Sequence, residues 1–423
     1  MASGVQPVKA AREWVARLTC GADSATVRLP VGDSHGREEG GDMRITAVKP
    51  FPITADRPYL FVKVETDEGI YGIGEAGITW REWAVEGAVK HLGSLLVGQD
   101  PFRTEFLWQQ MHRRAFFPAE KIVCAAISAI DIALWDIKGK ALGQPVYNLI
   151  GGLTRDKVVC YPHTRGDTLE ALLDSCRQAV RDGWKFVRTG VMDTGLAGGR
   201  NILEPAAAVR QTVKALEAMR DAVGPDIEIT CDAHTRIDTA DAVRLCKMVE
   251  PLDLFFMEDP LRSENPASYA TLARHTSVPI AAGEQWATKW FFRQVIEEEL
   301  ISYARIDLCI VGGITEALKV ARWCETHYIK LAPHNPLGPV STAACLQLDL
   351  ASDNVGVQEC PRVPGTSLSD LFPVQVPFEK GYLLAPDRPG LGIEFDESVV
   401  ARYPYKPGHS QALWRLDGSM TNW

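Results

Sequence analysis

The chain has 423 residues, of which 46% are hydrophobic and 23% charged, and its formal net charge is −9. This is the composition of an ordinary globular protein, and the length predicts two domains. The acidic balance and the lack of a basic block argue against a nucleic-acid partner. No apolar run is long enough to span a bilayer, so no membrane partner is expected. Ten cysteines without a C-x-x-C pair predict reduced thiols in a cytoplasmic protein.

The first third of the chain predicts an extension followed by a small domain. Residues 1–42 are rich in Gly, Ala, Arg and Asp and lack a secretory signal, so we expect a flexible N-terminal extension. Residues 60–76 alternate around a DEG turn and predict a hairpin. Apolar residues at helical spacing predict a helix over 119–142, ended by Gly143. Strands followed by helices indicate an α+β domain over residues 43–155.

Residues 156–375 repeat a pattern of apolar strand, loop and amphipathic helix. The strand candidates are KVVCYPH, KFVRTG, IEITCDAH, LFFMED, PIAAGE, ARIDLCI, IKLAPH and VGVQE. Eight such strands with helices between them predict a (β/α)₈ barrel, in which the chemistry lies at the carboxyl ends of the strands. Residues 376–423 are rich in Pro, Gly and aromatic residues, and we expect them to pack back on the N-terminal domain.

Three successive strand candidates each end in an acidic residue, namely Asp232, Glu258 and Glu284. The two intervals are 26 residues each, about the length of one strand, one helix and two loops, so the carboxylates should lie at the same end of adjacent strands. Three converging carboxylates predict an oxygen-only site for a hard cation, with Mg²⁺ the default. A helix cap or a surface position explains any one of these acids, but explains three in register poorly.

Two histidines and an aspartate are candidates for moving protons at this end of the strands. Asp307 lies inside the apolar sixth strand and His334 ends the seventh, so a buried Asp307 would orient the imidazole and favour its charged form. His334 is then a candidate general acid or base, and His234, two residues after Asp232, is the second ionisable group. The alternatives are a structural Asp307, a capping His334, and a ligating or structural His234.

Two further charged residues end strand candidates. Glu359 ends the eighth and faces the same mouth, although a surface acid would look identical in sequence. Arg188 ends the second and would hold an anionic substrate, with a solvated arginine as the alternative. Together with a cation that binds the substrate carboxylate, these groups suit removal of the proton α to it and protonation of a leaving hydroxyl.

The stretch AISAIDIALWDIKGKALGQPVYNLIGG and the three spaced acids resemble the mandelate racemase group of the enolase superfamily, from residue 43 to residue 423. The resemblance implies an α/β fold, a modified TIM barrel (β/α)₇β without the eighth helix, under an α+β capping domain completed by the C-terminal tail. It also implies Mg²⁺ as the cofactor and proton abstraction α to a carboxylate. Members of the group often form dimers or octamers, so a homo-oligomer is expected.

Five segments are similar to the acid-sugar dehydratases of this group: AHTR, LRSEN, GGITEA, HNPLGPVSTAACLQLD and WRLDGSMTNW. The resemblance implies that His334, paired with Asp307, removes the C2 proton of a galactonate-, gluconate- or mannonate-like acid. It further implies that His234 protonates the departing 3-hydroxyl and that Glu359 binds near the substrate carboxylate. The product would be a 2-keto-3-deoxy acid.

The chain departs from the racemases of the group at the end of the second strand. They have Lys-x-Lys where the segment VRTG has Arg188 and Gly190, which removes a base from one face and disfavours two-base racemisation. Arginine stays protonated and is a poor proton shuttle, although it still neutralises a carboxylate. The alternatives to a dehydratase are an epimerase or lactone-forming enzyme that works through His334 alone, and a catalytically weak metabolite-binding protein.

Overall fold

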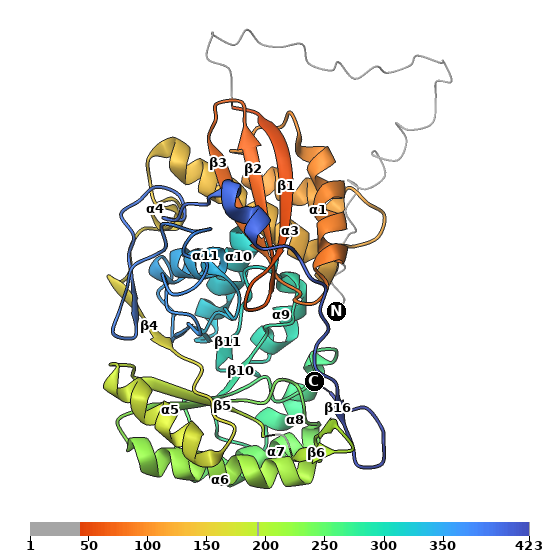
Figure 1. The fold of residues 1–423 in the computed structure, drawn as a ribbon, viewed down its shortest axis with the longest axis vertical. Helices are drawn as coiled ribbons and strands as arrows, with labels where there is room; N and C mark the ends of the chain where they lie inside the picture. The colour runs from red at the N-terminus through yellow and green to blue at the C-terminus, as the bar shows by residue number, and fades with distance from the viewer. Residues whose placement is uncertain (1–42, 193, 423) are drawn as a thin grey trace, which may run out of the picture. The chain divides into compact units, whose positions relative to one another are not determined.

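The computed structural model describes residues 43–192 and 194–422, so the extension predicted over residues 1–42 lies outside the described residues. The first elements form a three-stranded antiparallel meander in the order β1-β2-β3 with helices beside it (Figure 1). These strands are β1 (Ile45–Thr54), β2 (Pro58–Thr66) and β3 (Tyr71–Ala76), and the helices are α1 (Glu82–Leu96), α2 (Thr104–Arg113), α3 (Lys121–Leu142) and α4 (Val146–Ile150).

The predicted hairpin and the predicted long helix are both present. The hairpin is β2 and β3, paired with Leu60 opposite Ala76, and α3 ends at Gly143, which has the left-handed backbone of a helix C-cap. Helix and strand lie unusually close, because a Cβ on Gly72 or Gly74 would meet a backbone oxygen of α3 at 1.9 or 1.7 Å. The two glycines of β3 therefore allow the sheet to pack directly on α3.

Eight short parallel strands follow, and seven of them lie within the predicted runs. The sixth, β11, overlaps its predicted run only at Ala304, so Asp307 lies three residues past this strand rather than inside it. They are β4 (Lys157–Tyr161), β5 (Phe186–Gly190), β8 (Glu228–Asp232), β9 (Phe256–Glu258), β10 (Ile280–Ala282), β11 (Tyr303–Ala304), β12 (Lys330–Leu331) and β13 (Gln358–Glu359). Strands β5, β8, β9, β10, β11 and β12 are hydrogen-bonded in that order, and β13 pairs with β4. A parallel bridge from Leu331 to Val355 and hydrogen bonds between Thr164 and Arg188 close the ring.

A helix follows each strand except the last. The helices are α5 (Leu169–Arg181), α6 (Pro205–Val223), α7 (Thr239–Val249), α8 (Tyr269–Ala273), α9 (Thr288–Glu297), α10 (Gly313–Thr326) and α11 (Pro339–Leu350), with the short 3₁₀ turns η3 (Glu250–Leu252) and η4 (Pro266–Ser268). After β13 the only helical element in the described part of the chain is a 3₁₀ turn, η5 (Glu397–Arg402). The barrel is therefore (β/α)₇β, as the family resemblance implied, and the eight-fold repeat read from the pattern alone is wrong in its last unit.

The C-terminal tail contacts the barrel and the N-terminal elements in turn. Strands β14 (Phe378–Glu379) and β15 (Tyr382–Leu384) form a hairpin whose second strand pairs with β4. The chain then bonds to the N-terminal elements, where Gly390 exchanges backbone hydrogen bonds with Gln144 and Val146.

The tail ends beside the barrel. Strand β16 (Leu413–Trp414) joins the hairpin of β6 (Gly195–Ala197) and β7 (Arg200–Ile202), which lies between β5 and α6 (Figure 1). The domain limits expected near residues 155 and 375 stay predictions. Within residues 43–192 and 194–422, no helix is long and apolar enough to cross a membrane, and the nine cysteines are free and buried.

Candidate active site

A cavity of about 760 Å³ lies at the carboxyl ends of the barrel strands. The loops after the strands supply most of its lining, the N-terminal domain adds Arg57, Thr79 and Trp80, and the tail adds Gln411. Six of the eight residues singled out in the sequence line this cavity: Arg188, Asp232, His234, Glu284, His334 and Glu359. The other two, Glu258 and Asp307, are buried beside lining residues.

Strand register brings the acidic residues together. Asp232 ends β8 opposite Glu258, which ends β9, and Glu284 lies two residues past β10. All three are buried, and carboxylate oxygens of Glu258, Asp259 and Glu284 lie within 4.8 Å of one another. Asp259 was not singled out in the sequence, where the second acid of the run MEDP was its only signal.

These carboxyl groups repel one another in the absence of a counter-charge. Burial, reinforced by neighbouring carboxylates, raises the pKa of Glu258 to about 8 and that of Asp259 to about 8. Asp259 Oδ2 has no hydrogen-bond partner among the described residues, and Arg305 Nη2 lies 2.6 Å from Glu258 Oε1. Buried oxygen donors with excess negative charge fit a hard divalent cation such as Mg²⁺.

Asp232 is held differently from the other acids. Its carboxylate accepts a hydrogen bond from Arg188 Nη2 and lies 2.9 Å from His234 Nε2, and its Oδ1 accepts from the His234 backbone N–H at 2.7 Å. Burial alone would raise the pKa of Asp232, but the charges of His234 and Arg188 hold it well below the ordinary range. Arg188 is buried, and it faces the cavity beside the acids rather than solvent.

The predicted contact between His334 and Asp307 is present. His334 Nδ1 lies 2.7 Å from Asp307 Oδ2, and Asp307 Oδ1 accepts from the Cys309 backbone N–H at 2.7 Å. A carboxylate only accepts hydrogen bonds, so Nδ1 carries the hydrogen and Nε2 faces Glu284 Oε2 at 3.4 Å. Although burial lowers it, the pKa of His334 is raised overall by Glu284, Glu359 and Asp307.

His234 lies across the ring from His334. His234 follows β8 and His334 follows β12, and three strands separate β8 from β12 on either side of the closed ring. Burial lowers the pKa of His234, although Asp232 opposes this. The backbone of His234 and Thr235 is left-handed, with φ of 49° and 54°, which non-glycine residues rarely adopt.

Hydrogen bonds on both sides of Thr235 hold this strained turn. The Thr235 N–H donates to the Asp259 carbonyl at 2.8 Å, and Asn422 Nδ2 donates to the Thr235 carbonyl at 3.0 Å. Arg262 in turn donates to Asn422 Oδ1. The tail therefore holds the loop that carries His234, an arrangement that could not be predicted from the sequence.

Glu359 is the centre of a buried polar network. Its oxygens lie 2.6 Å from His163 Nε2 and 2.6 Å from Arg305 Nη2, and accept from the Asn335 backbone N–H at 2.8 Å. Despite burial, the charges of Arg305, His334 and His163 hold the pKa of Glu359 well below its ordinary value. Sequence reasoning missed Arg305 and His163, whose only signal was a charged or polar residue near the end of an apolar strand.

Comparisons with known proteins identify the family of the chain. Residues 45–151 match the model of the mandelate racemase/muconate lactonizing enzyme N-terminal domain, and residues 171–399 match the enolase C-terminal domain-like model. The chain is 40% identical over 374 residues to the D-galactonate dehydratase of Ralstonia pickettii, covering 86% of this chain and 96% of the relative. It is 33% identical over 404 residues to a D-mannonate dehydratase of Caulobacter sp., covering 90% and 100%.

Solved structures agree as well. A crystal structure of an enolase from Pantoea ananatis with bound D-gluconate and Mg superposes with a TM-score of 0.85 at 31% identity, covering 90% of this chain and all of that chain. The named relatives are dehydratases of sugar acids, which are hydro-lyases, the enzyme class that the sequence predicted. The chain belongs to the mandelate racemase/muconate lactonizing enzyme family of the enolase superfamily.

Proposed function

We propose that the protein is a Mg²⁺-dependent dehydratase of a galactonate-, gluconate- or mannonate-like sugar acid. It would remove the C2 proton and eliminate the 3-hydroxyl, giving water and a 2-keto-3-deoxy acid. The observation that carries the proposal is the placement of two histidines with opposite pKa shifts on opposite sides of one ring, beside a buried group of carboxylates.

His334 is the proposed base. Asp307 holds the hydrogen on Nδ1, which leaves the Nε2 lone pair to accept the C2 proton. The carboxylates around it raise its pKa, so it binds a proton more strongly than an ordinary imidazole. As the C–H bond breaks, its electron pair is delocalised into the substrate carboxylate as an enediolate, and it then forms the C2–C3 double bond as the C3–O bond breaks.

His234 is the proposed acid. It lies across the ring, so its proton would reach the departing 3-hydroxyl from the face opposite to His334 and release it as water. A lowered pKa makes the protonated imidazole a stronger acid, as this role requires. The enol that remains then tautomerises to the 2-keto acid, and the opposed placement favours elimination of the proton and hydroxyl in the anti sense.

Asp232, Glu258 and Glu284 are the proposed ligands of the cation. Asp259 lies with the two glutamates and competes with Asp232 for the third place, because Asp232 is paired with Arg188. When bound, Mg²⁺ would neutralise the negative charge that develops on the substrate carboxylate as the C2 proton leaves. Arg188 would add positive charge near that carboxylate.

Glu359 is the proposed acceptor for a substrate hydroxyl near the carboxylate.

The end of β5 gives a reason to prefer elimination over racemisation. A Cβ on Gly190 would lie 3.3 Å from the Asp232 carbonyl and 4.0 Å from His234 Nδ1, so a side chain there would point at His234. The racemases of the family have a lysine at this place, and its absence removes the second base.

The test is a screen of sugar acids with Mg²⁺, in which semicarbazide detects the 2-keto-3-deoxy product. We expect at least one six-carbon acid to be eliminated, and none by the His334→Asn variant. Exchange of the C2 proton with solvent deuterium without elimination would instead support an epimerase. No turnover by the folded, Mg²⁺-loaded protein would refute the proposal that it is a dehydratase.

Two further predictions remain proposals: a homo-oligomer, which would be a dimer or octamer, and a cytoplasmic location. Light scattering tests the oligomeric state.

A further inference from the structure

Five arginines line the cavity, and three of them, Arg57, Arg165 and Arg362, border one side of it. Arg57 lies in the turn between β1 and β2, Arg165 follows β4 and Arg362 follows β13. Strands β4 and β13 are neighbours in the ring, and β9 and β10, which carry the metal-binding glutamates, lie opposite them. These arginines therefore lie on the side of the cavity opposite the metal-binding glutamates, and they share that side with Glu359 at the end of β13.

Two of the arginines share one acceptor. Arg57 Nη1 and Arg362 Nη1 donate to the Pro336 carbonyl at 2.5 and 2.7 Å, so two positive charges meet at one oxygen. Arg57 Nη2 also donates to Thr79 Oγ1. A carbonyl acceptor orients both side chains without neutralising either charge.

The positive charge of this cluster exceeds its negative charge. Asp56 pairs with Arg362 at 2.7 Å, but over residues 43–192 and 194–422 no carboxylate lies within ion-pair distance of Arg57 or Arg165. The polar contact of Arg165 is His163 Nδ1 at 3.1 Å. Burial and the nearby Arg362 lower the pKa of Arg57, although the charges of Glu75 and Asp56 oppose this.

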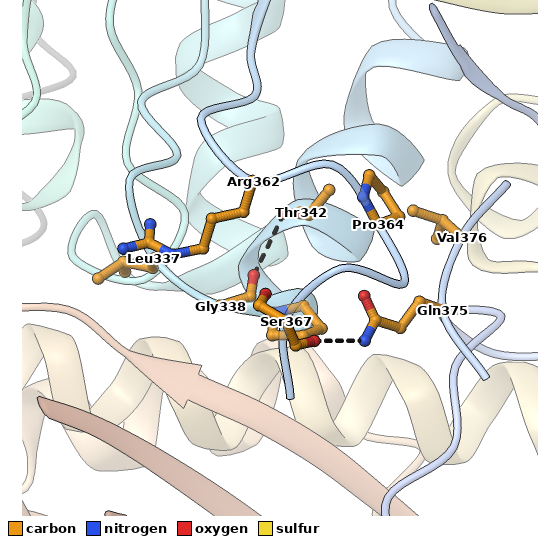
Figure 2. A pocket seen from close by; sticks show the side chains of 9 residues that line it. Leu337, Gly338, Thr342, Arg362, Pro364, Ser367, Gln375 and Val376 are labelled. Atoms are coloured by element: carbon orange, nitrogen blue, oxygen red, sulfur yellow. Dashed lines mark hydrogen bonds between the residues drawn. The ribbon is translucent and has the colours of Figure 1, made fainter. Parts of the chain in front are cut away.

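The buried acids near the cluster, Glu359 and Glu75, are bonded elsewhere, and Glu359 lies 2.6 Å from both His163 Nε2 and Arg305 Nη2. Both oxygens of Glu75 accept backbone N–H groups at the start of α11, from Gly338 at 2.7 Å and Ser341 at 2.9 Å. On its other side, Arg362 borders a hollow of about 10 Å³ beside Gly338 (Figure 2). That volume holds at most one water, so an anion must reach the arginines from the large cavity.

We propose that Arg57, Arg165 and Arg362 form a subsite for a second acidic group, at the end of the substrate remote from the carboxylate that lies beside C2. This inference rests on the proposed function and narrows its substrate to a dianion. The group would be a terminal carboxylate or a phosphate ester, since guanidinium forks bind the oxygens of both in pairs. A neutral terminal hydroxyl would leave Arg57 and Arg165 without a carboxylate at ion-pair distance among the described residues.

The experiment compares three ligands of the same six-carbon stereochemistry: the monoacid, the acid with a second carboxylate at C6, and the 6-phosphate. Turnover is measured with the Mg²⁺-loaded full chain, and binding by calorimetry with the His334→Asn variant. We expect one of the two dianions to exceed the monoacid by about tenfold or more in kcat/KM and in affinity, the effect of a charge-assisted hydrogen-bond pair. Which dianion is preferred distinguishes a carboxylate from a phosphate.

Variants test whether the three arginines cause the preference for a dianion. Arg57→Gln, and separately Arg165→Gln in case the first does not fold, should reduce the ratio of dianion to monoacid kcat/KM by about tenfold. Arg113→Gln, on the exposed end of α2 away from the cavity, is the matched control and should keep the ratio.

Four outcomes separate this inference from the proposed function. Dianion preference that depends on Arg57 or Arg165 supports both. Elimination of monoacids with no preference for dianions overturns the subsite and leaves the dehydratase standing. Tight, arginine-dependent binding of a dianion without turnover supports the subsite and overturns the dehydratase. Neither turnover nor preferential binding overturns both.

Discussion

Asp131 joins helix α3 to the barrel helix α10, and the pH dependence of the free energy of unfolding tests this contact quantitatively. Its side chain is fully buried, and it accepts hydrogen bonds from Thr315 N at 2.9 Å and Thr315 Oγ1 at 2.5 Å, in the first turn of α10. Burial raises the pKa of Asp131 from its ordinary 3.8 to about 7, although these hydrogen bonds oppose the shift. The folded protein therefore holds a proton that the unfolded chain has already released.

The sign and size of the effect follow from this difference. Because the pKa is raised on folding, this carboxyl stabilises the fold most below pH 4, and its contribution is lost as pH rises towards 7. Between pH 5 and pH 8 the loss amounts to about 3 kcal/mol. Asp131→Asn cannot ionise, so its free energy of unfolding should fall by about 3 kcal/mol less than that of the wild type over this interval.

Urea unfolding followed by tryptophan fluorescence at pH 5, 6, 7 and 8 measures this difference. Thr315→Val is the matched variant, because it removes the hydroxyl that favours the ionised carboxylate and should make the loss steeper. Equal losses for the wild type and Asp131→Asn would refute the reasoning, since they would mean that Asp131 is ionised in the folded protein throughout.

Four further predictions concern the site. His334→Asn should abolish exchange of the C2 proton with solvent deuterium, measured by NMR, and exchange at the wild-type rate would remove His334 as the base. His234→Asn should slow elimination but retain some exchange, and unaffected elimination would contradict its role as the acid. Asp232→Asn should weaken Mg²⁺ binding in calorimetry more than Asp259→Asn does, and the reverse order would give the third ligand place to Asp259. Asn422→Asp keeps an oxygen for Arg262 but loses the donor to Thr235, so we expect elimination to slow by about 3- to 10-fold with the fold intact; an unchanged rate would show that the tail does not position His234.

Features set by local pattern could be predicted from the sequence. The strands occur at apolar runs that end in polar residues. The equal spacing of Asp232, Glu258 and Glu284 placed these three acids at the same end of neighbouring strands, because each strand–helix unit has nearly the same length. The last barrel unit could not be read in this way. Pattern alone predicted an eighth helix, and only the family resemblance replaced it with the tail.

Features set by contacts between distant segments could not be predicted. Arg305 and His163 each look like a single polar residue in an apolar strand, and their partner Glu359 lies far along the chain. The Arg57 contact with the Pro336 carbonyl joins a turn of the first sheet to a loop near the end of the barrel. The left-handed turn of His234 and Thr235 is bonded to an asparagine almost two hundred residues later, a contact that no local pattern predicts.

The docking of β16 on β7 has a consequence for the order in which the parts of the protein fold during synthesis. Residues 413–422 are synthesised after all the barrel strands, so a nascent chain can hold a closed barrel, with its acids and histidines in place, before the loop of His234 is fixed. Catalytic competence would then appear as a late event in biogenesis, separable from folding of the barrel.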